Sequence, residues 1–328
     1  MAEAKVGHLE RTAAEPRDKS LHTVTLAEVT QINDQIRLFC LELSAPLRFL
    51  PGQWLDVYVP GVSKAGGYTI TSPPSKARPA TATTETEETS DSSSSSSPGY
   101  LELAVQKSED PPAAWLWQDP DAITYAELRV RVGGSFVWPP PGVNARALRR
   151  VVFVAGGVGV NPLVSVVASL AEKSGAMSAS ASASSSFEVR FLYSLKDERE
   201  DEDGKADRLL FVERIARIFT AGKLRGGLQL FLTGGGGGDG DGDGKGSEGV
   251  LSYGGDKEGV DGGDVPFLRR RMTVDDVAAA VGDASERRFA AVYVCGVPTM
   301  TDEFVQKLTD PQHGLGMESH RVLCEKWW

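Results

Sequence analysis

The stretch Gly156–Gly159 is the part of the sequence best suited to binding a charged ligand, because three of its four residues are glycine. It follows the apolar run 151–155, which has the composition of a buried strand in a parallel sheet. Asn161 and Pro162 come next, and these residue types favour the cap and the first turn of a helix. A strand, a glycine turn and a helix start place backbone N–H groups against an anionic diphosphate. We therefore predict a nucleotide-binding loop; a plain strand-to-helix turn is the alternative.

The elements that must position this loop alternate between strand and helix. β-branched and aromatic runs favour strands, and apolar residues spaced three or four apart favour helices. Such alternation indicates a parallel α/β sheet. The expected strands are 151–155, 189–193, 228–232 and 290–295, and the expected helices are 161–173, 208–219, 273–281 and 299–308.

The N-terminal part of the chain has a different rhythm. Short runs of alternating apolar and polar residues are separated by Gly and Pro, which is typical of an antiparallel barrel or sandwich. Asp110 followed by two prolines predicts a capped helix over 110–117. The expected strands are 23–30, 36–43, 53–59, 66–72, 100–106 and 127–132. The fold class predicted for the whole chain is an antiparallel β-barrel followed by a parallel-sheet α/β domain.

The domain boundaries follow from these two rhythms and from changes in composition. Residues 1–20 are expected to form a flexible tail, 21–142 the barrel and 147–328 the α/β domain, joined by a Pro-rich linker. Three segments have low-complexity compositions typical of solvated inserts. They are the Thr/Glu/Ser-rich segment 77–98, the Ser/Ala-rich segment 174–186 and the Gly/Asp-rich segment 233–264.

Charge and composition exclude several function classes. The chain of 328 residues carries a net charge of −10 and no basic block, which argues against nucleic acid as a partner. Its three cysteines have no paired spacing, so neither a disulfide framework nor a metal site is predicted. No apolar run is long enough to predict a membrane span. The first twenty residues are too acidic for a typical transit peptide.

Three motifs in this order resemble those of the ferredoxin–NADP reductase superfamily. Tyr68-Thr-Ile-Thr-Ser72 resembles its flavin motif, Ala155-Gly-Gly-Val-Gly-Val-Asn-Pro-Leu163 its nucleotide loop, and Cys295-Gly-Val-Pro-Thr-Met300 its nicotinamide segment. The ending Cys324-Glu-Lys-Trp-Trp328 is similar to that of the branch called oxidoreductase NAD-binding-domain-containing protein. The resemblance spans nearly the whole chain and implies a flavin domain followed by an NAD(P) domain.

On the flavin side, the resemblance implies that Tyr68 offers an aromatic face and Thr69 a hydroxyl donor to the flavin ring. An ordinary strand end is the alternative. Gly66 stands where the superfamily has an arginine that neutralises the flavin diphosphate, and the helix at 110–117 replaces a second phosphate motif. The flavin-binding residues expected from the resemblance are Gly67, Tyr68, Thr69, Ser72, Ala113 and Ala114.

On the nucleotide side, Cys295 is expected to approach the nicotinamide and align hydride transfer, with a buried core cysteine as the alternative. Trp327 or Trp328 could cover the flavin and be displaced by the nicotinamide, or could dock on the sheet edge. The catalytic candidates are thus Cys295, Thr69 and Trp328. The nucleotide-binding candidates are Gly156, Gly157, Val158, Gly159, Asn161, Pro162, Tyr193, Ser194, Cys295, Gly296, Pro298, Met300, Trp327 and Trp328.

These expectations define a flavoprotein reductase that passes hydride from NAD(P)H to FAD or FMN and electrons to a separate acceptor, which could be a protein. The acidic run 197–203 favours NAD over NADP, because a 2′-phosphate needs Arg or Lys. The competing hypothesis is a non-catalytic dinucleotide-binding protein on a degenerate reductase fold, since Gly66 replaces the expected arginine. The resemblance implies a mitochondrial location, with the cytoplasm as the alternative.

Overall fold

The computed structural model describes residues 7–79, 97–177, 187–197, 205–206, 208–234, 247–254 and 262–327. The chain divides into two compact units, residues 1–135 and 136–328. The sequence places the boundary slightly later, at the Pro-rich segment that ends at Gly142, because that segment has the composition of a linker. Each unit has its own sheet.

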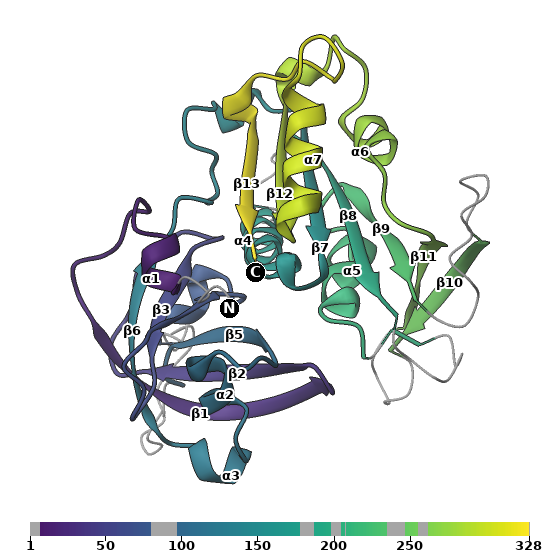
Figure 1. Cartoon of the computed structure of the whole chain (residues 1–328). Coiled ribbons are helices and arrows are strands. Elements are labelled where there is room, and N and C mark those ends of the chain that lie inside the picture. Colours follow the sequence, from purple (N-terminus) through teal and green to yellow (C-terminus); the bar gives the residue numbers. More distant parts are fainter. Residues whose placement is uncertain are drawn as a thin grey trace, which may run out of the picture. The chain divides into compact units, whose positions relative to one another are not determined.

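Within the described residues of the first unit, six strands form an antiparallel sheet in the order β4-β3-β6-β1-β2-β5 (Figure 1). An isolated bridge between Ile70 and Leu103 joins the chain just after β4 to β5, so the two edges of the sheet meet as in a barrel. The strands are β1 (His22–Asn33), β2 (Ile36–Leu43), β3 (Trp54–Tyr58), β4 (Gly66–Thr69), β5 (Tyr100–Gln106) and β6 (Glu127–Gly133). The helices are α1 (His8–Arg11), α2 (Pro111–Leu116) and α3 (Pro120–Ile123).

Alternation of side chains explains why these strands form. In β2, for example, Phe39, Leu41 and Leu43 point into the core, whereas Glu42 between them is exposed. The inward residues of all six strands join one apolar cluster with Leu116 of α2 and Ile123 of α3. This confirms the antiparallel β fold predicted for the N-terminal part.

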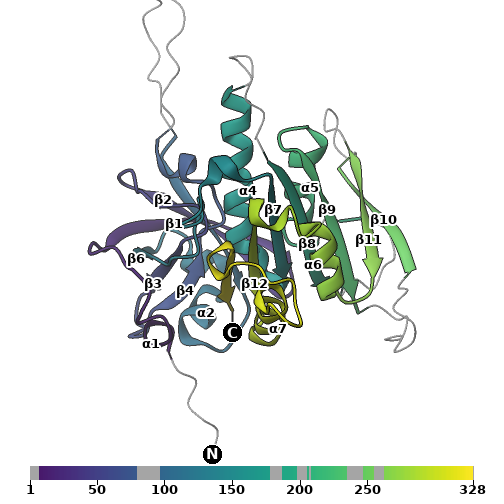
Figure 2. The ribbon, with the colours of Figure 1, turned by 90° about the horizontal axis from the view of Figure 1, so that it is seen from above.

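Within the described residues of the second unit, seven strands form a mainly parallel sheet in the order β10-β11-β9-β8-β7-β12-β13. The strands are β7 (Arg150–Gly156), β8 (Glu188–Lys196), β9 (Gly226–Thr233), β10 (Ser247–Tyr253), β11 (Gly263–Arg269), β12 (Ala290–Gly296) and β13 (Val322–Lys326). The helices are α4 (Val160–Met177), α5 (Val212–Thr220), α6 (Val274–Val281) and α7 (Pro298–Thr309). Figures 1 and 2 show α4 and α5 on one face of the sheet and α6 and α7 on the other.

The strand order creates a switch point between β7 and β12. The chain moves outward from β7 through β8 to β9 on one side, and then crosses to β12 and β13 on the other. Ligands of open α/β sheets bind at the carboxyl ends of strands at such a point. The glycine loop follows β7 and the Cys295-Gly-Val-Pro segment ends β12, so the topology brings the two nucleotide motifs together. This confirms the parallel α/β fold predicted for the C-terminal part.

The structure corrects three expectations. Residues 7–18 are not a flexible tail, because α1 and a bridge between Arg17 and Gly133 tie them to the first unit. β10 and the start of β11 lie inside the expected insert 233–264, and residues 174–177 belong to α4. β13 was not expected from the sequence. The remaining parts of the three inserts, 80–96, 178–186, 235–246 and 255–261, lie outside the described residues.

Candidate nucleotide and flavin sites

The glycine loop leaves the end of β7 and enters α4 through a single 3-10 turn at Gly157–Gly159. Gly157 is exposed and has a φ of +53°, a left-handed conformation that glycine adopts without strain. Gly159 is buried, and a Cβ there would lie only 2.2 Å from the backbone oxygen of Cys295. Gly157 therefore shapes the turn, and Gly159 allows the loop to pack against β12.

The same packing extends to the surface of the switch point. A Cβ on Gly156 would lie 2.8 Å from the Met300 sulfur, and one on Gly296 would lie 3.4 Å from the Gly156 Cα. The ends of β7 and β12 thus approach closely because neither carries a side chain there, and the Met300 side chain packs beside both. Pro298 is the first residue of α7, whose start also faces this edge.

The loop departs from the sequence expectation in its helix start. α4 begins at Val160, so Asn161 is a helical residue and not the cap; Asn161 and Pro162 are both buried. Val158 is partly exposed beside Gly157. A helix of 18 residues therefore begins directly at the switch point, and its positive end favours an anionic ligand.

Cys295 lies at the end of β12 with a fully buried side chain. Burial raises the pKa of the Cys295 thiol well above its ordinary value, Glu325 acts in the same direction, and the Trp327 indole opposes both. The thiol is therefore neutral at physiological pH, which suits a packing or positioning role better than nucleophilic attack.

The chain end lies beside Cys295. β13 pairs in parallel with β12, and the backbone N–H of Trp327 donates to the Gly296 carbonyl at 3.0 Å. Residues 322–327 therefore dock on the edge of the sheet. This pairing places Trp327 at the carboxyl end of β12. Trp328 lies outside the described residues.

At the end of β8, the two candidates Tyr193 and Ser194 differ in exposure. Tyr193 is 1% exposed and forms part of the core, whereas Ser194 is partly exposed. Asp197, the first residue of the acidic run, is buried and forms an ion pair with Arg269 of β11 at 3.7 Å. The rest of that run, 198–203, lies outside the described residues.

In the first unit, the motif Tyr68–Ser72 begins in β4 and continues beyond the end of that strand at Thr69. Tyr68 and Gly66 share one face of the strand, and a Cβ on Gly66 would lie 2.6 Å from the Tyr68 ring. The ring thus folds back over the position where the superfamily has arginine. Burial raises the pKa of Tyr68, and the nearby Asp110 carboxylate raises it further. The phenol is neutral, and it extends towards the start of α2.

The polar atoms of this motif fall into two groups. Thr71 donates to the Glu102 carboxylate at 2.7 Å, and Ser72 accepts from the Glu102 N–H at 3.1 Å. By contrast, the Tyr68 hydroxyl and the Thr69 hydroxyl are buried and have no hydrogen-bond partner among the described residues. Buried hydroxyls are normally satisfied, so each of these two would be stabilised by a polar ligand that supplied a partner. They project from opposite faces of β4, Tyr68 with Gly66 and Thr69 with Gly67.

The start of α2 offers fewer donors than the sequence suggests. Its first two residues are prolines and lack an N–H, and the Ala114 N–H already donates to the Asp110 carbonyl at 2.8 Å. Among the first residues of this helix, only the Ala113 N–H remains to bind a phosphate. The expected contribution of Ala114 is therefore not supported, because its N–H closes the first turn.

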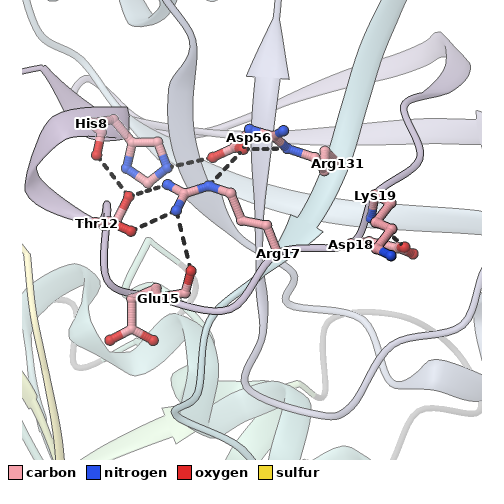
Figure 3. A network of polar contacts seen from close by, with 8 residues as sticks. All are labelled: His8, Thr12, Glu15, Arg17, Asp18, Lys19, Asp56 and Arg131. Carbon is pink, nitrogen blue, oxygen red and sulfur yellow. Dashed lines mark hydrogen bonds and ion pairs between the residues drawn. The ribbon is translucent and has the colours of Figure 1, made fainter.

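A buried ion cluster that was not expected from the sequence surrounds Asp56, in the middle of β3. Asp56 is 0% exposed and accepts hydrogen bonds from His8 at 2.9 Å, Arg17 at 3.1 Å and Arg131 at 2.6 Å (Figure 3). Burial alone would raise the pKa of Asp56, but the bonds from His8, Arg131 and Arg17 hold it below its ordinary value. A lone acid between Leu55 and Val57 in an apolar strand was the only available signal.

This cluster predicts a specific acid sensitivity. The pKa of Asp56 is lower in the folded chain than the value near 3.9 expected in the unfolded chain, so its contribution is complete above about pH 4. It is lost as the pH falls through the folded pKa. Urea unfolding between about pH 6 and 3 should show the free energy of unfolding falling more steeply in the wild type than in Asp56→Asn. Equal pH dependence in both would contradict a charged Asp56.

Two structural absences hold for the part of the chain that is described. No helix there is both long and apolar enough to cross a membrane. Across the same ranges, no group of three or more His, Cys, Asp or Glu side chains is arranged to hold a metal ion.

Comparison with known sequences identifies relatives along nearly the whole chain. A protein of Bos taurus named oxidoreductase NAD-binding domain-containing protein 1 is 27% identical over 326 residues, which cover 98% of this chain and 85% of the relative. The protein of the same name from Danio rerio is 32% identical over 164 residues, covering 50% and 53%. No family model matches the chain.

Solved structures share the fold at low sequence identity. The FAD/NAD-binding domain of nitric oxide dioxygenase from Vibrio cholerae aligns with a TM-score of 0.57 and 15% identity, covering 93% of this chain and 98% of that one. A ferredoxin NADP+ reductase from Neisseria gonorrhoeae with bound FAD and NADP aligns with a TM-score of 0.58 and 11% identity, covering 94% and 99%. The chain is therefore a homologue of the proteins named oxidoreductase NAD-binding domain-containing protein 1, and it has the fold of the ferredoxin–NADP reductase superfamily.

Proposed function

We propose that this protein is a flavin-dependent oxidoreductase that uses NADH as its hydride donor and delivers electrons to a separate acceptor. A bound flavin supplies the chemistry that connects a two-electron donor to that acceptor. The protein's own residues bind and orient the reactants. The observation that carries the proposal is that Tyr68 and Thr69 each bury a hydroxyl without a partner among the described residues, one on either face of β4.

These hydroxyls test whether the first unit fits a flavin. An unsatisfied buried hydroxyl costs free energy, and the cost is removed when a ligand supplies a partner. Tyr68 adds an aromatic face, and Ser72 is already ordered by Glu102. The ring-binding side of the site therefore fits a flavin.

The phosphate-binding side fits less well. The Tyr68 ring covers Gly66, where the superfamily has arginine, and the start of α2 retains only the Ala113 N–H among its first residues. Fewer charge-assisted hydrogen bonds mean weaker binding of a diphosphate. FAD is proposed as the cofactor because the Neisseria gonorrhoeae relative in fold binds it, but FMN loses less from a missing diphosphate contact.

On the nucleotide side, the proposed dock for NADH is the switch point between β7 and β12. Gly157 leaves the loop surface open, and the start of α4 favours a diphosphate. Cys295 and Met300 would orient the nicotinamide, with the Cys295 thiol neutral so that no charge disturbs hydride transfer. Trp327 and Trp328 are proposed to be displaced when the nicotinamide binds. NADH is preferred in this proposal because an acidic run follows β8.

Replacing Thr69 with valine tests the flavin site, because it should raise the stability of the flavin-free protein and lower its affinity for flavin. Valine keeps the shape of threonine and removes the unsatisfied hydroxyl, so the flavin-free protein should gain about 1 kcal/mol of stability. The same change removes a donor to the flavin, so the dissociation constant for FAD or FMN should rise about tenfold. Urea unfolding and flavin fluorescence titration provide the two measurements.

Thr71→Val is the matched control two residues along the chain. Its hydroxyl is already bonded to the Glu102 carboxylate at 2.7 Å, so this variant should lose stability where Thr69→Val gains it. If Thr69→Val destabilises the flavin-free protein and leaves flavin affinity unchanged, the hydroxyl has a structural role and the proposed flavin site is wrong.

The second candidate is a non-catalytic dinucleotide-binding protein, and the covered Gly66 position favours it. This candidate retains NADH binding at the second unit and has no flavin. Wild-type protein that stays colourless after incubation with FAD and with FMN, yet binds NADH, would establish it against the reductase. A yellow protein would exclude it.

A further inference from the structure

The N-terminal segment 7–18, which we name the strap, crosses the outer face of three neighbouring strands of the first unit. It is joined to β6 where the Asp18 N–H donates to the Val132 carbonyl at 2.8 Å and the Gly134 N–H donates to the Pro16 carbonyl at 3.0 Å. Across β3, the Arg17 guanidinium bonds to Asp56. The strap reaches β4 through His8, which packs on Gly67, so it runs in the order β6, β3, β4 that the sheet itself has. Figure 3 shows His8 and Arg17 of the strap bonded to Asp56.

His8 makes three contacts at the end of the strap. Its ring packs directly over Gly67, where a Cβ would lie 2.1 Å from the His8 Cε1 atom. It lies edge-on to the Trp54 ring at 4.8 Å between centroids, and it bonds to Asp56 at 2.9 Å. The histidine side chain is only 8% exposed. Glycine at position 67 is thus the residue that makes room for His8.

The register connects these contacts to the flavin motif. Asp56 is opposite Gly67, and Trp54 is opposite Thr69, in the antiparallel pair of β3 and β4. Residues opposite each other project from the same face of a sheet, so Gly67 and Thr69 share the face that the strap covers. β4 is the last strand of the sheet order, and on its side away from β3 the strand pairing found among the described residues is the short bridge at Ile70. His8 therefore packs on the part of β4 that carries the unsatisfied Thr69 hydroxyl.

We propose that His8 is a positioning residue for the flavin motif: it clamps β4 against β3 at Gly67 and so fixes the Thr69 hydroxyl. The inference rests on the proposed function, because it assigns the strap a role in flavin binding. It goes beyond that function, since it assigns a role to a residue that no motif contains. Arg17 and Arg131 hold Asp56, and Asp56 in turn orients the His8 ring.

The test is a double-mutant cycle between His8 and Gly67, read out by flavin affinity and by the visible spectrum of the bound flavin. His8→Ala removes the clamp, so the dissociation constant should rise about tenfold. Gly67→Ala places a methyl group against the ring and should have a similar effect. In the double variant the methyl group meets no ring, so the loss should not exceed that of His8→Ala alone. His8→Phe keeps a ring over Gly67 and should recover part of the affinity.

Amide hydrogen exchange supplies a readout that does not depend on flavin. Exchange at Tyr68, Thr69 and Ile70 should be about tenfold faster in His8→Ala, while the amides of β1 and β2 keep their wild-type rates. Arg37→Ala, on β2, is the control and should change neither exchange at β4 nor flavin affinity. Additive effects in the cycle, or wild-type exchange at β4 in His8→Ala, would overturn the positioning role. If wild-type protein binds neither FAD nor FMN, the proposed function fails, and exchange at β4 alone decides whether His8 clamps the strand.

Discussion

Replacing Asp56 with alanine is expected to destabilise the protein by about 3–5 kcal/mol, the range measured when one partner of a buried ion cluster is removed. The carboxylate is 0% exposed, and the side chains of Arg17 and Arg131 are only 14% and 25% exposed. Without the acid, two guanidinium groups and an imidazole face one another with no compensating charge. Urea unfolding followed by tryptophan fluorescence measures the loss, since Trp54 lies beside the cluster.

Glu213→Ala is the appropriate control for this change. Glu213 pairs with Arg217 one turn along α5 at 2.7 Å, but both side chains are at least one-third exposed. Such a surface pair contributes about 0.3–0.5 kcal/mol, so the control should unfold nearly as the wild type does. An Asp56→Ala variant that loses less than about 1 kcal/mol would mean that water replaces the carboxylate and that the cluster is not a structural centre.

Gly159→Ala is expected to have the second large effect. The added Cβ would lie 2.2 Å from the backbone oxygen of Cys295, and backbone cannot rotate away as a side chain can. Overpacking of this kind costs about 1–3 kcal/mol. The displaced loop would also move the start of α4, so kcat/KM for NADH should fall about hundredfold, as for a misplacement of about 1 Å.

Gly157→Ala, two residues earlier, separates crowding from backbone strain. Its φ is +53° and a Cβ there meets nothing within 4 Å, so only the left-handed conformation is penalised, by about 1–2 kcal/mol. Unfolding in urea of the NADH-free proteins should therefore show the larger loss of stability in Gly159→Ala. The reverse order would show that close packing on β12 does not position the loop.

Much of the fold could be predicted from the sequence because its strands and helices carry strong local signals. Alternating runs such as Ile36–Leu43 and the continuous apolar run after Arg150 match the observed strands. β10 was missed because its sequence, Ser247–Tyr253, lies in a glycine-rich and aspartate-rich segment with only two buried residues, Leu251 and Tyr253. β13 was missed because a five-residue strand at a chain end has too little periodicity to be recognised.

The candidate sites also divide into a part with a local sequence signal and a part without one. Glycine spacing predicted the loop at 156–159, since backbone conformation and close approach leave a mark in the residue type. The strap could not be predicted, because His8 and Arg17 lie in a segment of mixed charge that resembles a solvated tail. Their partner Asp56 is 48 residues from His8 along the chain, and only the folded sheet brings them together. The loss of the Ala114 donor likewise depends on a hydrogen bond within α2.

The central claim is most directly tested by anaerobic titration of the flavin-loaded protein with NADH, followed by absorbance in the visible region. We predict that the yellow colour bleaches with one equivalent of NADH per flavin, more rapidly than with NADPH, and returns when an electron acceptor is admitted. A flavin that remains oxidised with excess NADH, in protein shown to bind both ligands, would contradict the assignment as a reductase.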